Sequence, residues 1–113
     1  MMKQIASAAV VSLALGFGMS ATAGNIALGK AKSEEAACLS CHGADGVKGL
    51  DGSYPILAGQ YEDFLVRALT DYKVGRRKNA VMSGMAAALS KQDIENLAAY
   101  YASLPGPMGT IKR

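Results

Sequence analysis

Both cysteines and the only histidine of this 113-residue chain lie in one short segment, Cys38-Leu39-Ser40-Cys41-His42. Cys-x-x-Cys-His is the spacing at which haem is attached covalently. The two thiols add to the vinyl groups on one edge of the porphyrin, forming two thioether bonds, and the histidine that follows directly is placed beneath the iron. The sequence therefore predicts one haem c, attached through Cys38 and Cys41, with His42 as an iron ligand.

Three other uses of paired cysteines fit this chain less well. A thioredoxin-like redox motif requires a surrounding βαβ pattern, and no run of β-branched residues flanks Cys38. A structural zinc site takes about four Cys or His ligands, whereas the chain has two Cys and one His. A disulfide between Cys38 and Cys41 would close a loop too short to stabilise the chain much. Covalent haem attachment is therefore the interpretation that we prefer.

The sixth position of the iron cannot be filled by a second histidine of the same chain, because His42 is the only one. Methionine is the natural alternative, and two candidates, Met82 and Met85, lie in the segment Val81-Met82-Ser83-Gly84-Met85. A methionine can equally fill a gap in the core, so spacing alone leaves the choice between them open. Met108 lies in a tail flanked by proline and glycine, where we expect it at the surface.

The N-terminal residues have the organisation of a secretory signal peptide. Lys3 precedes an apolar stretch, residues 5–19, and Ala21-Thr22-Ala23 provides a small-x-small cleavage site. The apolar stretch is shorter than the roughly 20 residues that span a bilayer, and serine and glycine interrupt it, which disfavours a retained anchor. We therefore expect residues 1–23 to be cleaved and residues 24–113 to form a monohaem domain in the periplasm, without stable membrane insertion.

The charge balance of the chain disfavours one class of partner. Twelve basic residues stand against nine acidic ones, so that removal of Lys3 with the signal peptide leaves eleven against nine and lowers the formal charge from +3 to +2. A nearly neutral protein does not attract nucleic acid in bulk. A chain of this length also buries only a modest core, and a covalent haem would supply apolar volume to it.

The first half of the mature chain predicts a helix followed by a long loop. The mature chain has no convincing alternating strand pattern, so the expected fold class is all-α. Asn25 is a candidate N-cap of a first helix that runs into the Cys38–His42 segment. We expect the apolar face of this helix to include Ile26, Ala27, Ala31 and Ala36. Residues 43–59 contain five glycines and one proline, which predicts a loop that can wrap closely around a flat ligand.

Two more helices are predicted in the second half. Residues 60–74 place apolar side chains at three-and-four spacing, which is typical of an amphipathic helix. Ser90-Lys91-Gln92-Asp93 resembles a capping box, and the last helix that it opens ends before Pro105. The apolar stripe of that helix is Ile94, Leu97, Ala98, Tyr101 and Leu104. Met82 and Met85 are expected in a loop between the two helices.

Four motifs occur in order along the mature chain: CLSCHGADG at 38–46, YPILAGQ at 54–60, RKNAVMSGMA at 77–86 and LAAYY at 97–101. With these motifs the chain resembles the class I c-type cytochromes, in particular the short soluble bacterial type related to the dihaem periplasmic cytochromes c. The resemblance covers the whole mature chain. It implies the small cytochrome c fold, with helices wrapped around a single haem.

The resemblance also implies roles for particular residues. In the family the methionine at the position of Met82 is the axial ligand of the iron. The proline carbonyl at the position of Pro55 accepts a hydrogen bond from the ring nitrogen of the haem histidine that does not bind iron, and such a bond fixes the orientation of the ring. Leu97 and Tyr100 are expected to pack against Gly29 of the first helix, which lies slightly further from the haem motif than is usual in the family.

The expected function follows from the ligands. With His42 and Met82 filling both axial positions, no open site remains for a substrate, so we expect an electron carrier between respiratory-chain redox partners, an electron donor and a terminal oxidase or reductase, and not an enzyme. The basic cluster of Lys73, Arg76, Arg77 and Lys78 would steer an acidic partner or form an ordinary solvated loop.

Two alternatives keep the haem and change its use. In the first alternative the chain is a haem c subunit of an oxidase or dehydrogenase complex. In the second it is a five-coordinate haem sensor or peroxidase. The last alternative is disfavoured, because the four-helix-bundle proteins that work in this way carry their attachment motif near the C-terminus.

Overall fold

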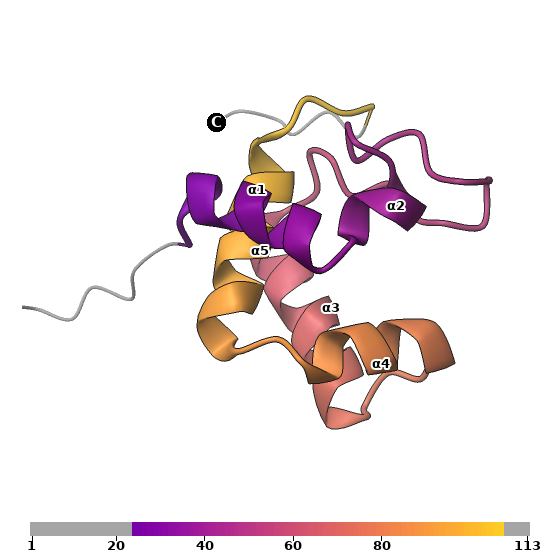
Figure 1. Ribbon diagram of the computed structural model, residues 1–113, viewed down its shortest axis with the longest axis vertical. Helices are drawn as coiled ribbons and strands as arrows, with labels where there is room; N and C mark the ends of the chain where they lie inside the picture. The colour runs from indigo at the N-terminus through magenta and orange to yellow at the C-terminus, as the bar shows by residue number, and fades with distance from the viewer. Residues whose placement is uncertain (1–23, 108–113) are drawn as a thin grey trace, which may run out of the picture.

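The computed structural model describes residues 24–107 and folds them into helices without strands. The helices are α1 (Ile26–Glu35), α2 (Cys38–His42), α3 (Glu62–Val74), α4 (Ala80–Ala87) and α5 (Lys91–Ser103). Figure 1 shows their arrangement, and the expected all-α fold is confirmed. The predicted signal peptide, residues 1–23, and Met108 lie outside the described residues.

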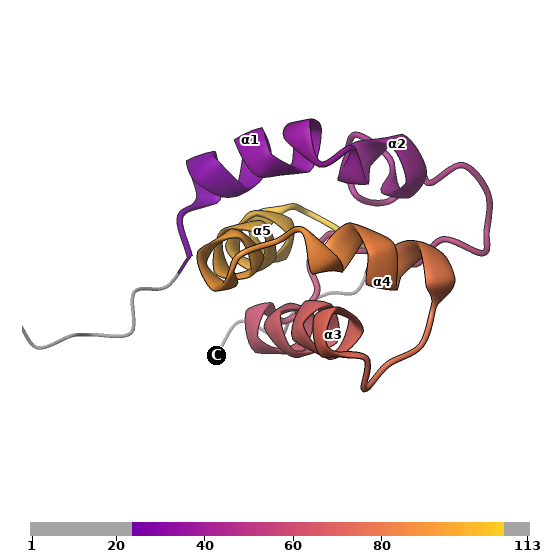
Figure 2. The same ribbon diagram turned by 60° about the horizontal axis from the view of Figure 1, so that its bottom comes forward.

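Helix α5 is the centre of the fold, because it packs against α1 on one side and against α3 on the other, as Figure 2 shows. Its N-terminus is the predicted capping box, in which the Ser90 side chain accepts from the Asp93 amide and the Asp93 carboxylate accepts from the Ser90 amide. The buried hydrophobic cluster consists mainly of α5 side chains with contributions from α3 and the segment after α4: Leu65, Leu89, Ile94, Leu97, Ala98 and Tyr101.

Helices α1 and α5 meet through their backbones. A Cβ atom added at Gly29 would lie 1.9 Å from the carbonyl oxygen of Asn96 and 2.7 Å from the Cβ of Tyr100. The contact of Gly29 with Tyr100 that the resemblance implied is therefore present. No side chain larger than hydrogen fits at Gly29 in this crossing.

The predicted apolar face of α1 is wrong for three of its four residues, since only Ala36 packs against the core. Ile26 is 52% exposed, and Ala27 and Ala31 are exposed as well. The residues that α1 does bury are Gly29 and Ser33, because a close helix crossing needs small side chains. The Ser33 hydroxyl remains satisfied in this interface, since its Oγ donates to the carbonyl of Lys30 at 2.7 Å.

The Cys38–His42 segment is a separate helix and does not continue α1. The first helix begins at the predicted N-cap, where the Asn25 side chain accepts from the Leu28 amide, and it ends at Glu35. Ala37 then takes a left-handed conformation with φ of 58° and starts α2 in a new direction. A left-handed alanine costs about 1 kcal/mol or more, so the break is imposed by the surrounding packing.

The expected loop around the two methionines contains a helix. Its N-cap is Asn79, whose Oδ1 accepts from the amides of Val81 at 3.1 Å and Met82 at 3.0 Å. Among the described helices α4 packs only against α3. The sequence prediction missed α4 because its eight residues, with Gly84 in the middle, are too few to show a helical period.

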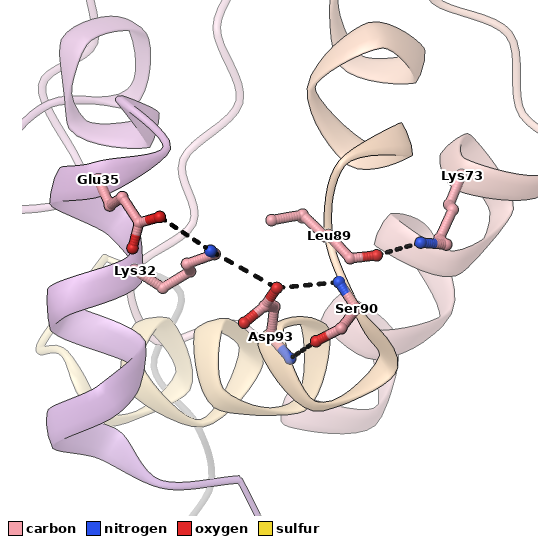
Figure 3. A network of polar contacts seen from close by, with 6 residues as sticks. All are labelled: Lys32, Glu35, Lys73, Leu89, Ser90 and Asp93. Carbon is pink, nitrogen blue, oxygen red and sulfur yellow. Dashed lines mark hydrogen bonds and ion pairs between the residues drawn. The ribbon is translucent and has the colours of Figure 1, made fainter.

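Polar contacts join α1 to α5, and α3 to the segment before α5, as Figure 3 shows. Lys32 of α1 lies 3.6 Å from the carboxylate of Asp93 and 3.3 Å from that of Glu35. On the other side Lys73, in the last turn of α3, donates to the carbonyl of Leu89. The segment that joins α4 to α5 is therefore held from α3, and the start of α5 is held from α1. None of the described helices is long and apolar enough to cross a membrane.

Candidate haem site

A cavity of about 860 Å³ opens between α2, the loop after it, α3, α4 and α5. Its volume lies within the range of about 300–1,000 Å³ that is typical of cofactor sites. Most of the lining is apolar, including Ile56, Leu57, Phe64, Leu65, Ala68, Leu69, Ala86, Leu89 and Leu97. The same cavity is lined by every candidate site residue from the sequence, namely Cys38, Cys41, His42, Pro55 and Met82, and also by Met85.

The imidazole of His42 is 6% exposed and has a defined hydrogen-bond partner. Its Nδ1 lies 2.9 Å from the carbonyl oxygen of Pro55. A carbonyl only accepts, so Nδ1 carries the proton and donates, and Nε2 keeps its lone pair free for a metal. The ring of Tyr54 contacts the imidazole edge-on, with centroids 6.2 Å apart. The sequence predicted the bond to Pro55 through the family resemblance and missed the contact with Tyr54.

The environment of the two cysteines bears on the alternative uses of this motif. Cys38 and Cys41 are free and half-buried. Burial raises the pKa of the Cys38 thiol above its ordinary value, whereas a catalytic Cys-x-x-Cys motif requires a lowered pKa. Among residues 24–107 no group of three or more His, Cys, Asp and Glu side chains is placed to hold a metal ion. The surroundings of Cys38 thus disfavour a reactive thiolate, and the described residues form no zinc cage.

The two methionines reach the cavity from α4 in different surroundings. Met82 is half-buried, and its backbone amide is bound by the Asn79 cap. Met85, one turn further along, is 43% exposed. The cap fixes the position of Met82 on the helix, while Met85 lies closer to solvent.

Tyr101 of α5 lines the cavity and was missed as a site residue. Burial raises the pKa of its phenol well above the ordinary value. The hydroxyl therefore stays protonated and neutral beside the apolar wall. Its position four residues after Leu97, which also lines the cavity, is the sequence pattern that could have revealed it.

The family model for cytochrome c matches residues 26–105. The thiosulfate dehydrogenase electron acceptor of Thiomonas intermedia (strain K12) is 45% identical over 85 residues, which are 71% of this chain and 39% of that protein. Cytochrome c-554(548) of Halomonas halodenitrificans is 43% identical over 84 residues, which are 72% of this chain and 98% of that protein. The structure of Acidithiobacillus ferrooxidans cytochrome c4 superposes with a TM-score of 0.66 at 32% identity, covering 75% of this chain and 53% of that one.

The chain therefore belongs to the cytochrome c family. Within it, the chain is a class I c-type cytochrome related to the dihaem cytochromes c4. It spans less than half the length of the first curated relatives that it matches, between 39% and 47%. Members of this family carry haem c, with its iron, covalently attached.

The residues present fit that cofactor. The cavity is large and apolar, as a porphyrin requires, and a pair of half-buried thiols at the attachment spacing lies in its wall. A histidine whose Nδ1 is already occupied by a carbonyl lies beside them. Soft sulfur donors and a neutral imidazole are ligands that suit iron in haem.

Proposed function

We propose that this protein is a one-electron carrier of the periplasm with a single covalently bound haem c. In this proposal residues 1–23 are a cleaved signal peptide and residues 24–113 are the monohaem domain. The observation that carries the proposal is that one apolar cavity is lined by Cys38, Cys41, His42 and Met82, with the Nδ1 of His42 held by Pro55.

Each of these residues has a separate task. Cys38 and Cys41 would form the two thioether bonds, and His42 would bind the iron through Nε2. The carbonyl of Pro55 fixes the tautomer and the orientation of the imidazole, which also raises its basicity as a ligand. Met82 would bind the iron through its thioether sulfur, which α4 brings to the cavity. When bound, haem c supplies an iron that changes between the ferrous and ferric states.

The lining of the cavity influences the reduction potential of the iron. An apolar lining excludes water from the iron and disfavours the additional positive charge of the ferric state, and thioether ligation favours the ferrous state in the same direction. With His42 and Met82 both bound to the iron, no position would be left for a substrate. The site therefore transfers electrons without catalysing a bond change, which is the basis for proposing that the protein is not an enzyme.

Redox proteins are the proposed partners, an electron donor and a terminal oxidase or reductase. The relative named as a thiosulfate dehydrogenase electron acceptor suggests a dehydrogenase as the donor. The same relative favours a second candidate function, a haem c subunit or domain within a dehydrogenase complex. Purification of the protein from its own periplasm distinguishes the two, because a free carrier elutes alone and a subunit elutes with an enzyme.

The ligand assignment is tested with single alanine variants. Met82→Ala is expected to leave an open haem that binds carbon monoxide and has a lower reduction potential, since the thioether ligand is lost. Met85→Ala is the matched control and should keep the wild-type spectrum with a small loss of stability. If Met85→Ala opens the iron and Met82→Ala does not, the ligand is Met85.

His42→Ala is expected to yield no stable holoprotein, because it removes the ligand and the hydrogen bond to Pro55 together. Cys38→Ala and Cys41→Ala should each leave at most one thioether bond, which pyridine haemochrome spectra detect. A His42→Ala protein with an unchanged spectrum would contradict the proposed site.

A further inference from the structure

Two consecutive loop residues contact the buried imidazole of His42 in different ways. The carbonyl oxygen of Pro55 lies 2.9 Å from Nδ1 and accepts its hydrogen bond. The ring of Tyr54 stands almost perpendicular to the imidazole, at an interplanar angle of 83° and a centroid distance of 6.2 Å. Aromatic rings at separations of about 4.5–7 Å attract each other in this T-shaped arrangement. The histidine is therefore held by a hydrogen bond and by a ring contact, both from the same short segment.

The two contacts restrict different motions of the imidazole. A carbonyl oxygen accepts hydrogen bonds over a broad range of directions, so the bond to Pro55 fixes the position of Nδ1 more tightly than the plane of the ring. A neighbouring ring that stands at 83° to this plane resists its rotation, because rotation removes the perpendicular contact. The ring of Tyr54 is thus placed to set the angle of the imidazole plane.

The backbone of Tyr54 is itself restrained. Proline fixes its own φ and confines the residue before it to extended conformations, so the Tyr54-Pro55 pair has few conformations open to it. The Tyr54 amide donates to the carbonyl of Asp51 at 3.3 Å. A Cβ atom added at Gly49 would lie 3.0 Å from the Cβ of Tyr54, so the base of the tyrosine side chain lies directly against the backbone.

The same loop is fastened to the helix that carries the histidine. The Leu50 amide donates at 3.0 Å to the carbonyl of Cys41, which directly precedes His42 in α2. Tyr54 is half-buried and lines the haem cavity together with Pro55 and His42. The loop and α2 therefore form one unit, in which the position of the tyrosine ring relative to His42 is defined.

We propose that Tyr54 is a positioning residue for His42, whose ring holds the plane of the imidazole at one angle about its bond to the iron. The proposal rests on the proposed function, since it takes iron ligation by His42 as given. The plane of an axial imidazole decides which iron d orbitals its π electrons overlap, and groups that orient a metal-binding histidine tune the metal. A fixed plane gives the ferric iron one electronic state and spares the ligand a rotation when the iron changes its oxidation state.

Tyr54→Leu and Tyr54→Phe test the proposal, with Tyr61→Leu as the matched control. Tyr54→Leu removes the ring and keeps an apolar side chain, whereas Tyr54→Phe keeps the ring. Tyr61 is a second tyrosine, is 60% exposed and does not line the haem cavity. The ferric holoproteins are compared by the g values of their electron paramagnetic resonance spectra and by the proton NMR shifts of their haem methyl groups. Both depend on the plane of the axial imidazole.

In Tyr54→Leu we expect shifted and broadened g values and a changed pattern of haem methyl shifts, because the imidazole then samples a range of angles. Tyr54→Phe should keep the wild-type pattern, since the contact is between rings and does not need the hydroxyl. Tyr61→Leu should also match the wild type. The unfolding free energy is measured in parallel, because a loss of packing alone lowers stability without changing these spectra.

Wild-type spectra in Tyr54→Leu, whatever its stability, would overturn the assignment of Tyr54. So would a Tyr54→Phe protein whose spectra depart from the wild type as far as those of Tyr54→Leu, since the ring would then not be the cause. Should Tyr54→Leu fail to accumulate as holoprotein, Tyr54→Met, which has a flexible apolar side chain without a ring, decides by the same spectra.

Failure of the proposed function gives a different result. A wild-type holoprotein that binds carbon monoxide in its ferrous state would refute the electron carrier. The comparison of the variants would still report on Tyr54, because the bond between His42 and the iron does not depend on the sixth ligand.

Discussion

The pair formed by α1 and α5 and the pair formed by α3 and α4 are stabilised in different ways. The first pair is in backbone contact at Gly29, and the N-terminus of α1 is held on α5 where the Asn96 side chain accepts from the Asn25 amide at 2.8 Å. The second pair includes a short helix that packs only on α3 and turns Met82 into the cavity.

The difference separates the fixed part of the site from the adaptable part. The histidine side is held by protein alone, through burial of His42 and its hydrogen bond to Pro55. The position of Met82 depends on the Asn79 cap, on the packing of α4 against α3 and on the haem that we propose for the cavity. We therefore expect changes in the α1–α5 pair to affect global stability, and changes in α4 to affect how tightly the sixth ligand is held.

The largest effect is expected from Gly29→Val. The added Cβ would meet the carbonyl oxygen of Asn96 at 1.9 Å, and a backbone atom inside a helix cannot move aside. The expected loss is at least about 3 kcal/mol of unfolding free energy. Gly84→Ala is the control, because nothing lies within 4 Å of its Cβ position and it does not line the cavity. It should stabilise α4 by about 0.5–1 kcal/mol. Urea unfolding of the two holoproteins measures both changes in unfolding free energy. Equal changes would show that the α1–α5 pair and the α3–α4 pair do not differ in this way.

The two helix caps provide an intermediate effect. Asn79→Ala and Ser90→Ala each remove a side-chain cap, from α4 and α5 respectively, and each should cost about 1 kcal/mol. Only Asn79→Ala releases the amide of Met82. The rate at which imidazole displaces the sixth ligand of the ferric protein should therefore rise in Asn79→Ala and stay at the wild-type value in Ser90→Ala. Equal rates in the two variants would show that α4 is held by other contacts.

The smallest effect is expected from Asp93→Asn. Hydrogen bonds from Ser90 hold the pKa of the Asp93 carboxyl below its ordinary value, and the charge of Lys32 acts in the same direction. A lowered pKa means that the carboxylate stabilises the fold above about pH 4, and that this contribution is lost as pH falls through the folded-state value. Asparagine keeps an acceptor for the cap and loses the charge. The urea midpoint of the variant should be slightly lower than that of wild type near neutral pH and equal to it in strong acid. A difference that persists in acid would have another origin.

Local signals in the sequence predicted much of this structure. Asn25 and the Ser90–Asp93 box cap the helices that they were expected to cap, and the glycine-rich segment 43–59 is a loop. The amphipathic pattern of 60–74 identified α3, which begins at Glu62. These features succeeded because each depends on residues close together in the chain.

The failures depend on distant contacts. The apolar pattern of α1 pointed to Ile26, whereas its buried residues are Gly29 and Ser33, since the interface is chosen by how closely α5 approaches. The left-handed turn at Ala37 has no local signature, because alanine does not favour it. For the site, the attachment residues were predicted from the Cys-x-x-Cys-His motif, and Met82 was predicted from the family resemblance. That Tyr101 and Arg77 line the cavity became visible only in the fold.

The central claim, that His42 and Met82 both bind the iron of one covalent haem, is tested most directly by the visible and near-red spectrum of the protein produced with haem maturation. We predict a sulfur-to-iron charge-transfer band in the ferric state and no change when carbon monoxide is added to the ferrous state. Absence of that band together with rapid carbon monoxide binding would contradict the account, because the iron would then have an open position.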